Sequence, residues 1–512
     1  MDRVEYTGIE RKHAMQRPGK CYLFGAAAVA ALAAAPASGQ VGNCAMPPSA
    51  AGGTDNIHTR YVEGHLLPPV IKSDARPFSL ADRMRQYDVP GISVAVIHDG
   101  KIVWARGWGV RDLASCKPVT PDTAFQAASI SKVVTAVTAL RLVEQGRIKL
   151  DQNINEALRS WQVPKDATLA PSGITLRELL SHTAGLGVHG FGGYQPGAPL
   201  PTPVQILDGV SPANTPPVRS ILPVGSQFEY SGGGYVVTQV ALSDVSDTAF
   251  ADLGRREVLE PLGMTRSAFT MPPSPAILAN AAFGSAQGKP MPSGYLVYPE
   301  LAPAGLWTTA TDLARLLIDL QASAAGKGGH RLSPAMTRLM MTPVKDNWGL
   351  GVAVYPQGAP RFMHDGVNAG YESFMVSYIG KGDGIVALTN GGDGHRLMGE
   401  VVRAIATDYG WSDIAAPATE EKELSLAELS KAAGHFEGGG LKVDLEARSE
   451  GLFARLAGGT MAERLIALSP TRFRSEGLGV TVEFTPDFAS CTMIEGAPPM
   501  KLVRSAPSHA AL

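Results

Sequence analysis

Residues 125–136 read FQAASISKVVTA, a mostly apolar run that holds Ser129 and, three positions later, Lys132. An ammonium group is costly to bury unless a partner or a chemical role compensates for it. Burial also lowers the pKa of a lysine, because it disfavours the charged form, so a buried amine can act as a base near neutrality. If a helix starts here, both side chains lie on one face of it. The run therefore predicts a nucleophilic serine that Lys132 deprotonates.

The alternative is chance, because a serine three positions before a lysine is a common pairing. This is, however, the only S-x-x-K in the sequence, and it stands at the predicted start of an apolar helix. There the backbone N–H of Ser129 is among the unsatisfied donors at the positive end of the helix dipole. Both points favour the catalytic interpretation.

Length and composition set the frame for this motif. The chain has 512 residues, which predicts two domains, and 45% hydrophobic with 18% charged residues is typical of a globular protein. The net charge of -2 gives no reason to expect nucleic acid as a partner. No cofactor or metal motif is present: there is no H-E-x-x-H, and GLGVHG at 185–190 follows no predicted strand.

The first 39 residues read as a secretory signal peptide. Basic residues precede an apolar run from Cys21 to Ala35, and small residues follow it. We therefore expect a periplasmic or secreted protein that has no other contact with the membrane; an uncleaved anchor is the alternative. A leader segment, 40–78, would follow the signal. In an oxidising compartment Cys44 and Cys116 could form a disulfide, or they could be buried apolar residues.

We predict that residues 79–415 form one α+β domain with an antiparallel sheet flanked by helices, plus a helical region. Strand-like segments occur at both ends of this range, so one sheet would combine them. Asp99-Gly100 predicts a hairpin turn between the first two strands. The long Pro/Gly-rich segments 187–225 and 271–304 predict rims or lids of a functional site.

Residues 423–512 have a different pattern. LKVDLEAR alternates strictly, and several other short strand-like segments are separated by turns. This pattern predicts a small antiparallel β domain of barrel or meander type.

Further motifs occur in a fixed order along the larger domain. They are SISK at 129–132, ITLRELLSHTAGL at 174–186, FEYSGGGY at 228–235, EPLGM at 260–264, AGLWTTATDLARL at 304–316 and HDGVNAGY at 364–371. On these motifs the sequence from about 80 to 410 resembles the serine β-lactamase/DD-peptidase superfamily in its class C-like branch. That branch includes DD-carboxypeptidases, D-aminopeptidases, linear-peptide hydrolases and esterases. The C-terminal domain resembles the lipocalin-like extensions of some of these peptidases.

The resemblance implies roles for further residues. Tyr230 would relay the proton between Ser129 and the leaving group, and His364 would stand where many relatives have the lysine of K-T-G. The backbone N–H groups of Ser129 and Val367 would form the oxyanion hole. One position departs from the family pattern: Gly232 replaces the asparagine of Y-x-N, which puts recognition of a β-lactam acylamino group in doubt. His182 has a structural role in the family, and the second His-Asp-Gly, at 98–100, lies in the predicted hairpin.

The expected function is a secreted serine hydrolase that cleaves amide or peptide bonds of short peptides through an acyl-enzyme. It needs no cofactor, and its partners are small-molecule or short-peptide substrates. A carboxylesterase or a weak β-lactamase could use the same machinery. A sensor whose serine is acylated without turnover is a further alternative.

Overall fold

The computed structural model describes residues 53–68, 76–327, 331–411, 414, 421–438, 441–456, 462–475, 480–494 and 500–506. The predicted signal peptide lies outside these residues. Cys116 is disulfide-bonded, whereas Cys491 has a buried free thiol. Cys44, the partner that we considered for Cys116, also lies outside the described residues.

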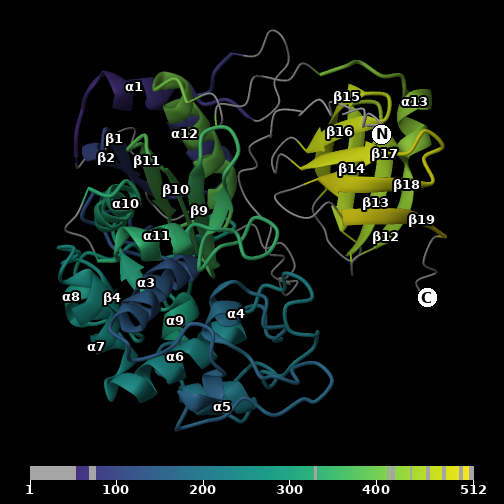
Figure 1. Ribbon diagram of the computed structural model, residues 1–512. Helices are drawn as coiled ribbons and strands as arrows, with labels where there is room; N and C mark the ends of the chain where they lie inside the picture. Colours follow the sequence, from purple (N-terminus) through teal and green to yellow (C-terminus); the bar gives the residue numbers. More distant parts are fainter. Residues whose placement is uncertain are drawn as a thin grey trace, which may run out of the picture.

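A six-stranded antiparallel sheet forms the centre of the larger domain, in the order β2-β1-β11-β10-β9-β8 (Figure 1). Its strands are β1 (Gly91–His98), β2 (Lys101–Gly109), β8 (Ala353–Tyr355), β9 (Arg361–Asn368), β10 (Tyr371–Tyr378) and β11 (Gly384–Thr389). The first strand of the chain pairs with β11, with Ile92 opposite Thr389, so the two ends of the domain complete one sheet as predicted. The α+β fold class is thereby confirmed.

The β1–β2 hairpin has the turn that Asp-Gly predicts. Asp99 and Gly100 have φ of 51° and 71°, as a type I′ turn requires at both central positions. The run WGLGVAVYP at 348–356 has a strand-like pattern, but a strand forms only at Ala353–Tyr355, because Gly351 at φ 84° interrupts the extended backbone.

Helices cover both faces of the sheet. On one face lie α1 (Ile57–Gly64), α2 (Leu80–Gln86) and α12 (Gly394–Asp408), and on the other α3 (Ser131–Glu144) and α10 (Ala310–Ala324). Strand β1 is buried on both sides, with Val94 in one hydrophobic cluster and Ala95 in the other. Helix α1 precedes residue 79, the predicted start of the larger domain, and buries Val62 against α12.

The rest of the larger domain is helical with short strands. Its helices are α4 (Leu176–Leu180), α5 (Pro203–Asp208), α6 (Gly232–Ser246), α7 (Phe250–Gly254), α8 (Pro275–Leu278), α9 (Leu301–Ala304) and α11 (Pro334–Met340), with the single turns η1 (Ala128–Ile130), η2 (Ile154–Glu156) and η3 (Arg255–Leu259). Its strands are β3 (Phe125–Gln126), β4 (Ala268–Phe269), β7 (Leu306–Thr308), β5 (Ser285–Ala286) and β6 (Lys289–Pro290). Helices α3 and α6 pack together, with α9 against both, and this packing brings distant motifs to one place.

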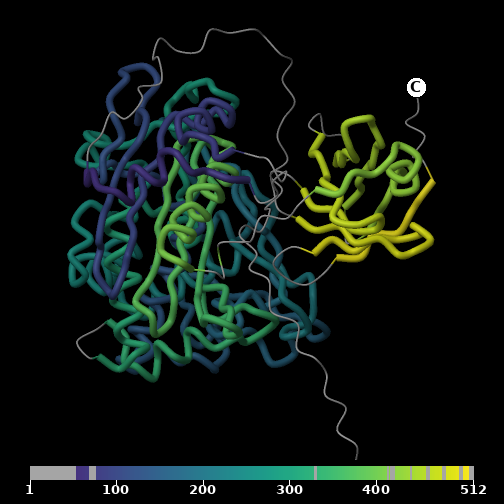
Figure 2. The backbone as a smooth tube through the Cα atoms, turned by 90° about the horizontal axis from the view of Figure 1, so that it is seen from above, coloured from purple at the N-terminus to yellow at the C-terminus, as the bar shows by residue number. Residues whose placement is uncertain are grey.

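The C-terminal region is a closed eight-stranded barrel in which each strand pairs with its neighbour in sequence. It comprises α13 (Leu426–Ala432), β12 (Gly434–Gly438), β13 (Leu441–Arg448), β14 (Gly451–Leu456), β15 (Glu463–Ser469), β16 (Arg472–Ser475), β17 (Thr481–Phe484), β18 (Ser490–Ile494) and β19 (Met500–Ser505). Phe436, Phe473 and Phe484 are buried in its core. Figure 2 shows the barrel as a separate body beside the larger domain, and Arg396 of α12 forms an ion pair with its Glu463.

In the part of the chain that the structure describes, no helix combines the length and the apolar character needed to cross a membrane.

Candidate active site

Ser129 lies in η1, the tight turn that joins β3 to α3. Ala128 before it has φ 47°, a left-handed conformation that is uncommon for a residue with a side chain. Helix α3 begins at Ser131, as the run SKVVTAVTALRLVEQG predicts. The left-handed turn at Ala128 leads into a 3-10 turn that carries Ser129 before regular helix geometry starts.

Lys132 is buried, with 2% of its surface exposed. Its Nζ donates hydrogen bonds to Ser129 Oγ at 2.9 Å and to the carbonyl oxygen of Pro303 in α9 at 3.0 Å. Burial lowers the pKa of Lys132 to about 7, and the nearby carboxyl of Asp365 opposes this shift. The predicted Ser–Lys pair is therefore present, and the amine can lose its proton near neutral pH.

Tyr230 lies beside the same serine. Burial raises the pKa of its phenol well above the ordinary value, and the interaction with the Ser129 side chain opposes this shift. Lys132 Nζ is 4.9 Å from the centre of the Tyr230 ring. Tyr230 directly precedes Ser231, whose Oγ caps α6 by accepting from the N–H of Gly234. The helix cap thus fixes the backbone that carries the tyrosine.

An aromatic cluster holds Tyr230 in place. The His182 ring stacks on the Tyr230 ring with centroids 4.2 Å apart, and its Nδ1 accepts a hydrogen bond from the N–H of Ser231. Trp348 stands edge-on to Tyr230, at 6.0 Å between centroids. His182 thus packs against the site as a supporting residue. Trp348 was missed, because a tryptophan at the start of a predicted strand gives no signal of such a contact.

His364 on β9 reaches the same cluster. It is 3% exposed, and its ring lies edge-on to Trp348 at 5.5 Å. Its Nδ1 is 2.5 Å from the carbonyl oxygen of Asp365, which can only accept, so Nδ1 carries the proton and Nε2 is the acceptor. Burial and the nearby Lys132 lower the pKa of His364 to about 3, so its imidazole is neutral at physiological pH. The other His-Asp-Gly is a turn: His98 contacts Asp383.

Strand β9 runs directly beside the backbone of Ser129. A Cβ on Gly366 would lie 2.7 Å from the Ser129 nitrogen and 2.6 Å from the carbonyl oxygen of Ala127, so only glycine permits this approach.

The direction of the Val367 N–H follows from the register of β9 and β10. Opposite residues in an antiparallel pair alternate between hydrogen-bonded and non-bonded. Asn368 and Tyr371 close the β9–β10 hairpin as a bonded pair, so the N–H of Val367 points away from β10. Strand β8 pairs with β9 only up to Met363, which leaves that N–H uncovered by β8.

The two long segments predicted as rims lie beside each other. Tyr194 and Val297 form a pair of backbone hydrogen bonds, and Ser293 bonds to Gln195. Both segments also reach the site, since the His189 ring lies 4.8 Å from that of Tyr230 and Pro303 contacts Lys132.

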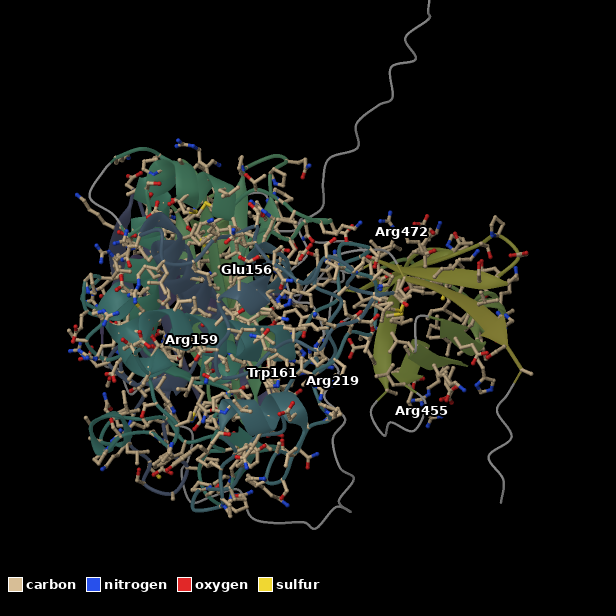
Figure 3. All side chains as sticks on the ribbon, turned by 60° about the horizontal axis from the view of Figure 1, so that its bottom comes forward. Glu156, Arg159, Trp161, Arg219, Arg455 and Arg472 are labelled. Carbon is tan, nitrogen blue, oxygen red and sulfur yellow. The ribbon has the colours of Figure 1, made fainter. Side chains whose placement is uncertain are left out.

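The first of these segments is anchored near its middle by Asp208. Its carboxylate accepts from the Trp161 indole at 2.9 Å and pairs with Arg219 at 3.6 Å; Figure 3 shows Trp161 and Arg219 side by side. Trp307 and Tyr371, aromatic residues of the motifs at 304–316 and 364–371, are fully buried in the core. Among the described residues, no group of three or more His, Cys, Asp or Glu side chains could hold a metal ion.

The sequence and fold define the class of protein. Residues 79–407 match the Beta-lactamase family model, and the chain belongs to this family, whose members are in general serine hydrolases. Penicillin-binding protein 4 of Amycolatopsis lactamdurans is 27% identical over 379 residues, which cover 69% of this chain and 94% of that protein. A beta-lactamase of Escherichia coli K12 is 28% identical over 215 residues, which cover 40% and 50%.

Solved structures show the same fold. The octameric penicillin-binding protein homologue from Pyrococcus abyssi superimposes with a TM-score of 0.57 at 23% identity, over 82% of this chain and 98% of that one. EstCE1, described as a hydrolase with promiscuous acyltransferase activity, gives a TM-score of 0.53 at 22% identity, over 68% and 98%.

Proposed function

We propose that the protein is a secreted serine hydrolase that cleaves amide or peptide bonds of short peptides through an acyl-enzyme. One observation carries this proposal: the buried amine of Lys132 donates a hydrogen bond to Ser129 Oγ, and the phenol of Tyr230 lies beside the same serine. A nucleophile, a base tuned to neutral pH and a proton relay are the groups that acyl transfer requires.

In the acylation step, neutral Lys132 takes the proton of Ser129 as Oγ bonds to the substrate's carbonyl carbon. The N–H groups of Ser129 and Val367 stabilise the oxyanion that forms. When the carbon–nitrogen bond breaks, the leaving nitrogen receives the proton of Tyr230, which Lys132 then restores. His364 Nε2, a neutral acceptor, takes a hydrogen bond from the substrate. Water attacks the ester next, and its proton follows the reverse path to free Ser129.

A carboxylesterase or a weak β-lactamase is the second candidate, because the same groups cleave any activated acyl bond. Two observations favour esters over β-lactams. Gly232 offers no amide to an acylamino side chain, and the neutral imidazole of His364 cannot pair with a β-lactam carboxylate as a lysine would. We expect short peptides or activated esters to exceed cephalosporins in kcat/KM by at least roughly tenfold, ~1.4 kcal/mol in transition-state binding.

A panel of short L- and D-peptides, acyl esters and a chromogenic cephalosporin, assayed on one preparation, tests this proposal. Turnover of peptides or esters with slow cephalosporin cleavage supports it. Efficient cephalosporin turnover without peptide or ester cleavage would contradict it. Labelling with a fluorophosphonate that is never followed by turnover of any substrate would favour the sensor.

Export is part of the proposal as well. It rests on the basic and apolar pattern of residues 1–39. Intact-mass analysis of the protein from the periplasm or medium should show loss of this segment; full-length protein retained in the cytoplasm would speak against export.

A further inference from the structure

The space beside Gly232 is already filled, and this has a consequence for substrate choice that builds on the proposed hydrolase function. Gly232 is the first residue of α6, two positions after Tyr230. A Cβ built there would lie 2.7 Å from Cε2 of the Phe191 ring and 3.0 Å from the carbonyl oxygen of His189. The phenyl ring therefore occupies the volume in which an asparagine side chain at this position would begin.

Phe191 is held there by the loop that carries it. The carbonyl oxygens of His189 and Val188 accept from the N–H groups of Gly232 and Gly233, and that of Gly187 accepts from Ser231 Oγ. These bonds satisfy donors at the start of α6 that lack partners within the helix. Val188 is left-handed, with φ 63°, a strained conformation for a β-branched residue. Three hydrogen bonds to one helix end fix this conformation, so the loop has a defined position in the site.

The same loop places a second side chain, that of His189, next to Tyr230. The His189 ring lies 4.8 Å from the Tyr230 ring, on a residue that is exposed to solvent. Partial burial, followed by the positive charge of Lys132, lowers the pKa of His189, so its imidazole is neutral at neutral pH. The wall beside Tyr230 therefore presents a phenyl ring and one neutral imidazole, and no amide from α6.

We propose that Phe191 is the specificity-determining residue on the acyl side of the substrate. It excludes acyl donors with an acylamino group on the carbon next to the scissile carbonyl, and it accepts unsubstituted acyl groups. An acylamino group would bring an N–H and a C=O against the ring, where they lose water and find no amide partner. A peptide meets this rule when the enzyme cleaves the bond after its first residue. That residue is then the acyl donor, and its nitrogen is not acylated.

The test compares two substrates that differ only in this group: the 4-nitrophenyl esters of propionic acid and of N-acetylalanine, the second as both enantiomers. The readout is the ratio of kcat/KM for the propionyl ester to that for each N-acetylalanyl ester. Because each variant is compared with wild type on the same pair, differences in intrinsic ester reactivity cancel. We expect Phe191→Ala to lower the ratio at least about tenfold, through faster N-acetylalanyl hydrolysis, with the propionyl rate kept within about fivefold.

Two further variants sharpen the result. Gly232→Asn alone should impair both esters, because its Cβ meets Phe191, whereas Phe191→Ala/Gly232→Asn should regain activity and lower the ratio below that of Phe191→Ala. Phe78→Ala, which removes a phenyl ring near α2 on the opposite face of the sheet, is the matched control and should leave the ratio unchanged.

A ratio in Phe191→Ala within about twofold of wild type, in a protein that melts cooperatively, would overturn the inference. Failure of the hydrolase function itself looks different: neither ester is cleaved and a fluorophosphonate does not label Ser129.

Discussion

Lys132 links the buried environment of the site to a pH dependence that can be measured. The base must be neutral to accept the proton of Ser129, and its pKa is lowered to about 7. We therefore predict that kcat/KM for a neutral ester rises about tenfold per pH unit below pH 7 and levels off above it. His364, with a pKa near 3, adds no step between pH 5 and 9. A rate that falls from pH 6 to pH 8 would contradict this role for Lys132.

Lys132 and Tyr230 should act as one unit, because both interact with the side chain of Ser129. We predict that Lys132→Met and Tyr230→Phe each lower kcat by roughly two to four orders of magnitude, and that the double variant is little worse than either. Single-turnover rates of the four proteins complete the cycle. Full additivity, or near-wild-type turnover in Tyr230→Phe, would remove the tyrosine from the relay.

Among individual residues, the sequence identifies those that belong to motifs. Ser129, Lys132, Tyr230 and His364 were all predicted, and the structure places them around one cluster. Phe191 and Trp348 were not predicted as site residues, because their roles depend on contacts with residues far away in the sequence. The left-handed conformations of Ala128 and Val188 also carry no local signal, since tertiary contacts impose them.

Among the elements, strand β9 leaves the least room for a larger side chain. Gly366 packs against the backbone on either side of Ala128, where a methyl group would lie under 3.0 Å from two backbone atoms. We predict that Gly366→Ala displaces β9 from η1, destabilises the protein by about 1–3 kcal/mol and lowers kcat by roughly a hundredfold or more. Thermal melts and ester kinetics measure the two effects. An equally active Gly366→Ala variant would contradict the oxyanion-hole assignment.

Elements with a clear local pattern were predicted well. The apolar run that follows Ser129 gave α3, and Asp99-Gly100 gave its hairpin. Strand β9 was not recognised, because its polar residues His364, Asp365 and Asn368 serve the site and break the pattern of a buried strand. Helix α1 was not predicted either, because it depends on packing against α12, which lies more than 300 residues later.

The whole molecule has two parts with separate hydrophobic cores. The core cluster of the barrel includes Cys491, which is 2% exposed and whose thiol pKa burial raises to about 11. We predict that at pH 8 a disulfide reagent such as DTNB modifies Cys491 only when the barrel unfolds, and that this exposure and the loss of ester hydrolysis have different denaturant midpoints. Cys491→Ala is the control for other thiols. Coincident midpoints would show that the two parts unfold together.

Acylation of Ser129 is the central claim, and mass spectrometry tests it most directly. The protein is mixed with excess 4-nitrophenyl propionate, quenched in acid during the steady state and again after the substrate is consumed, and then digested and mapped. We predict a propionyl group on the peptide containing Ser129 in the first sample, its absence in the second, and neither adduct nor turnover in a folded Ser129→Ala variant. An adduct on another residue, or turnover that survives Ser129→Ala, would contradict the account.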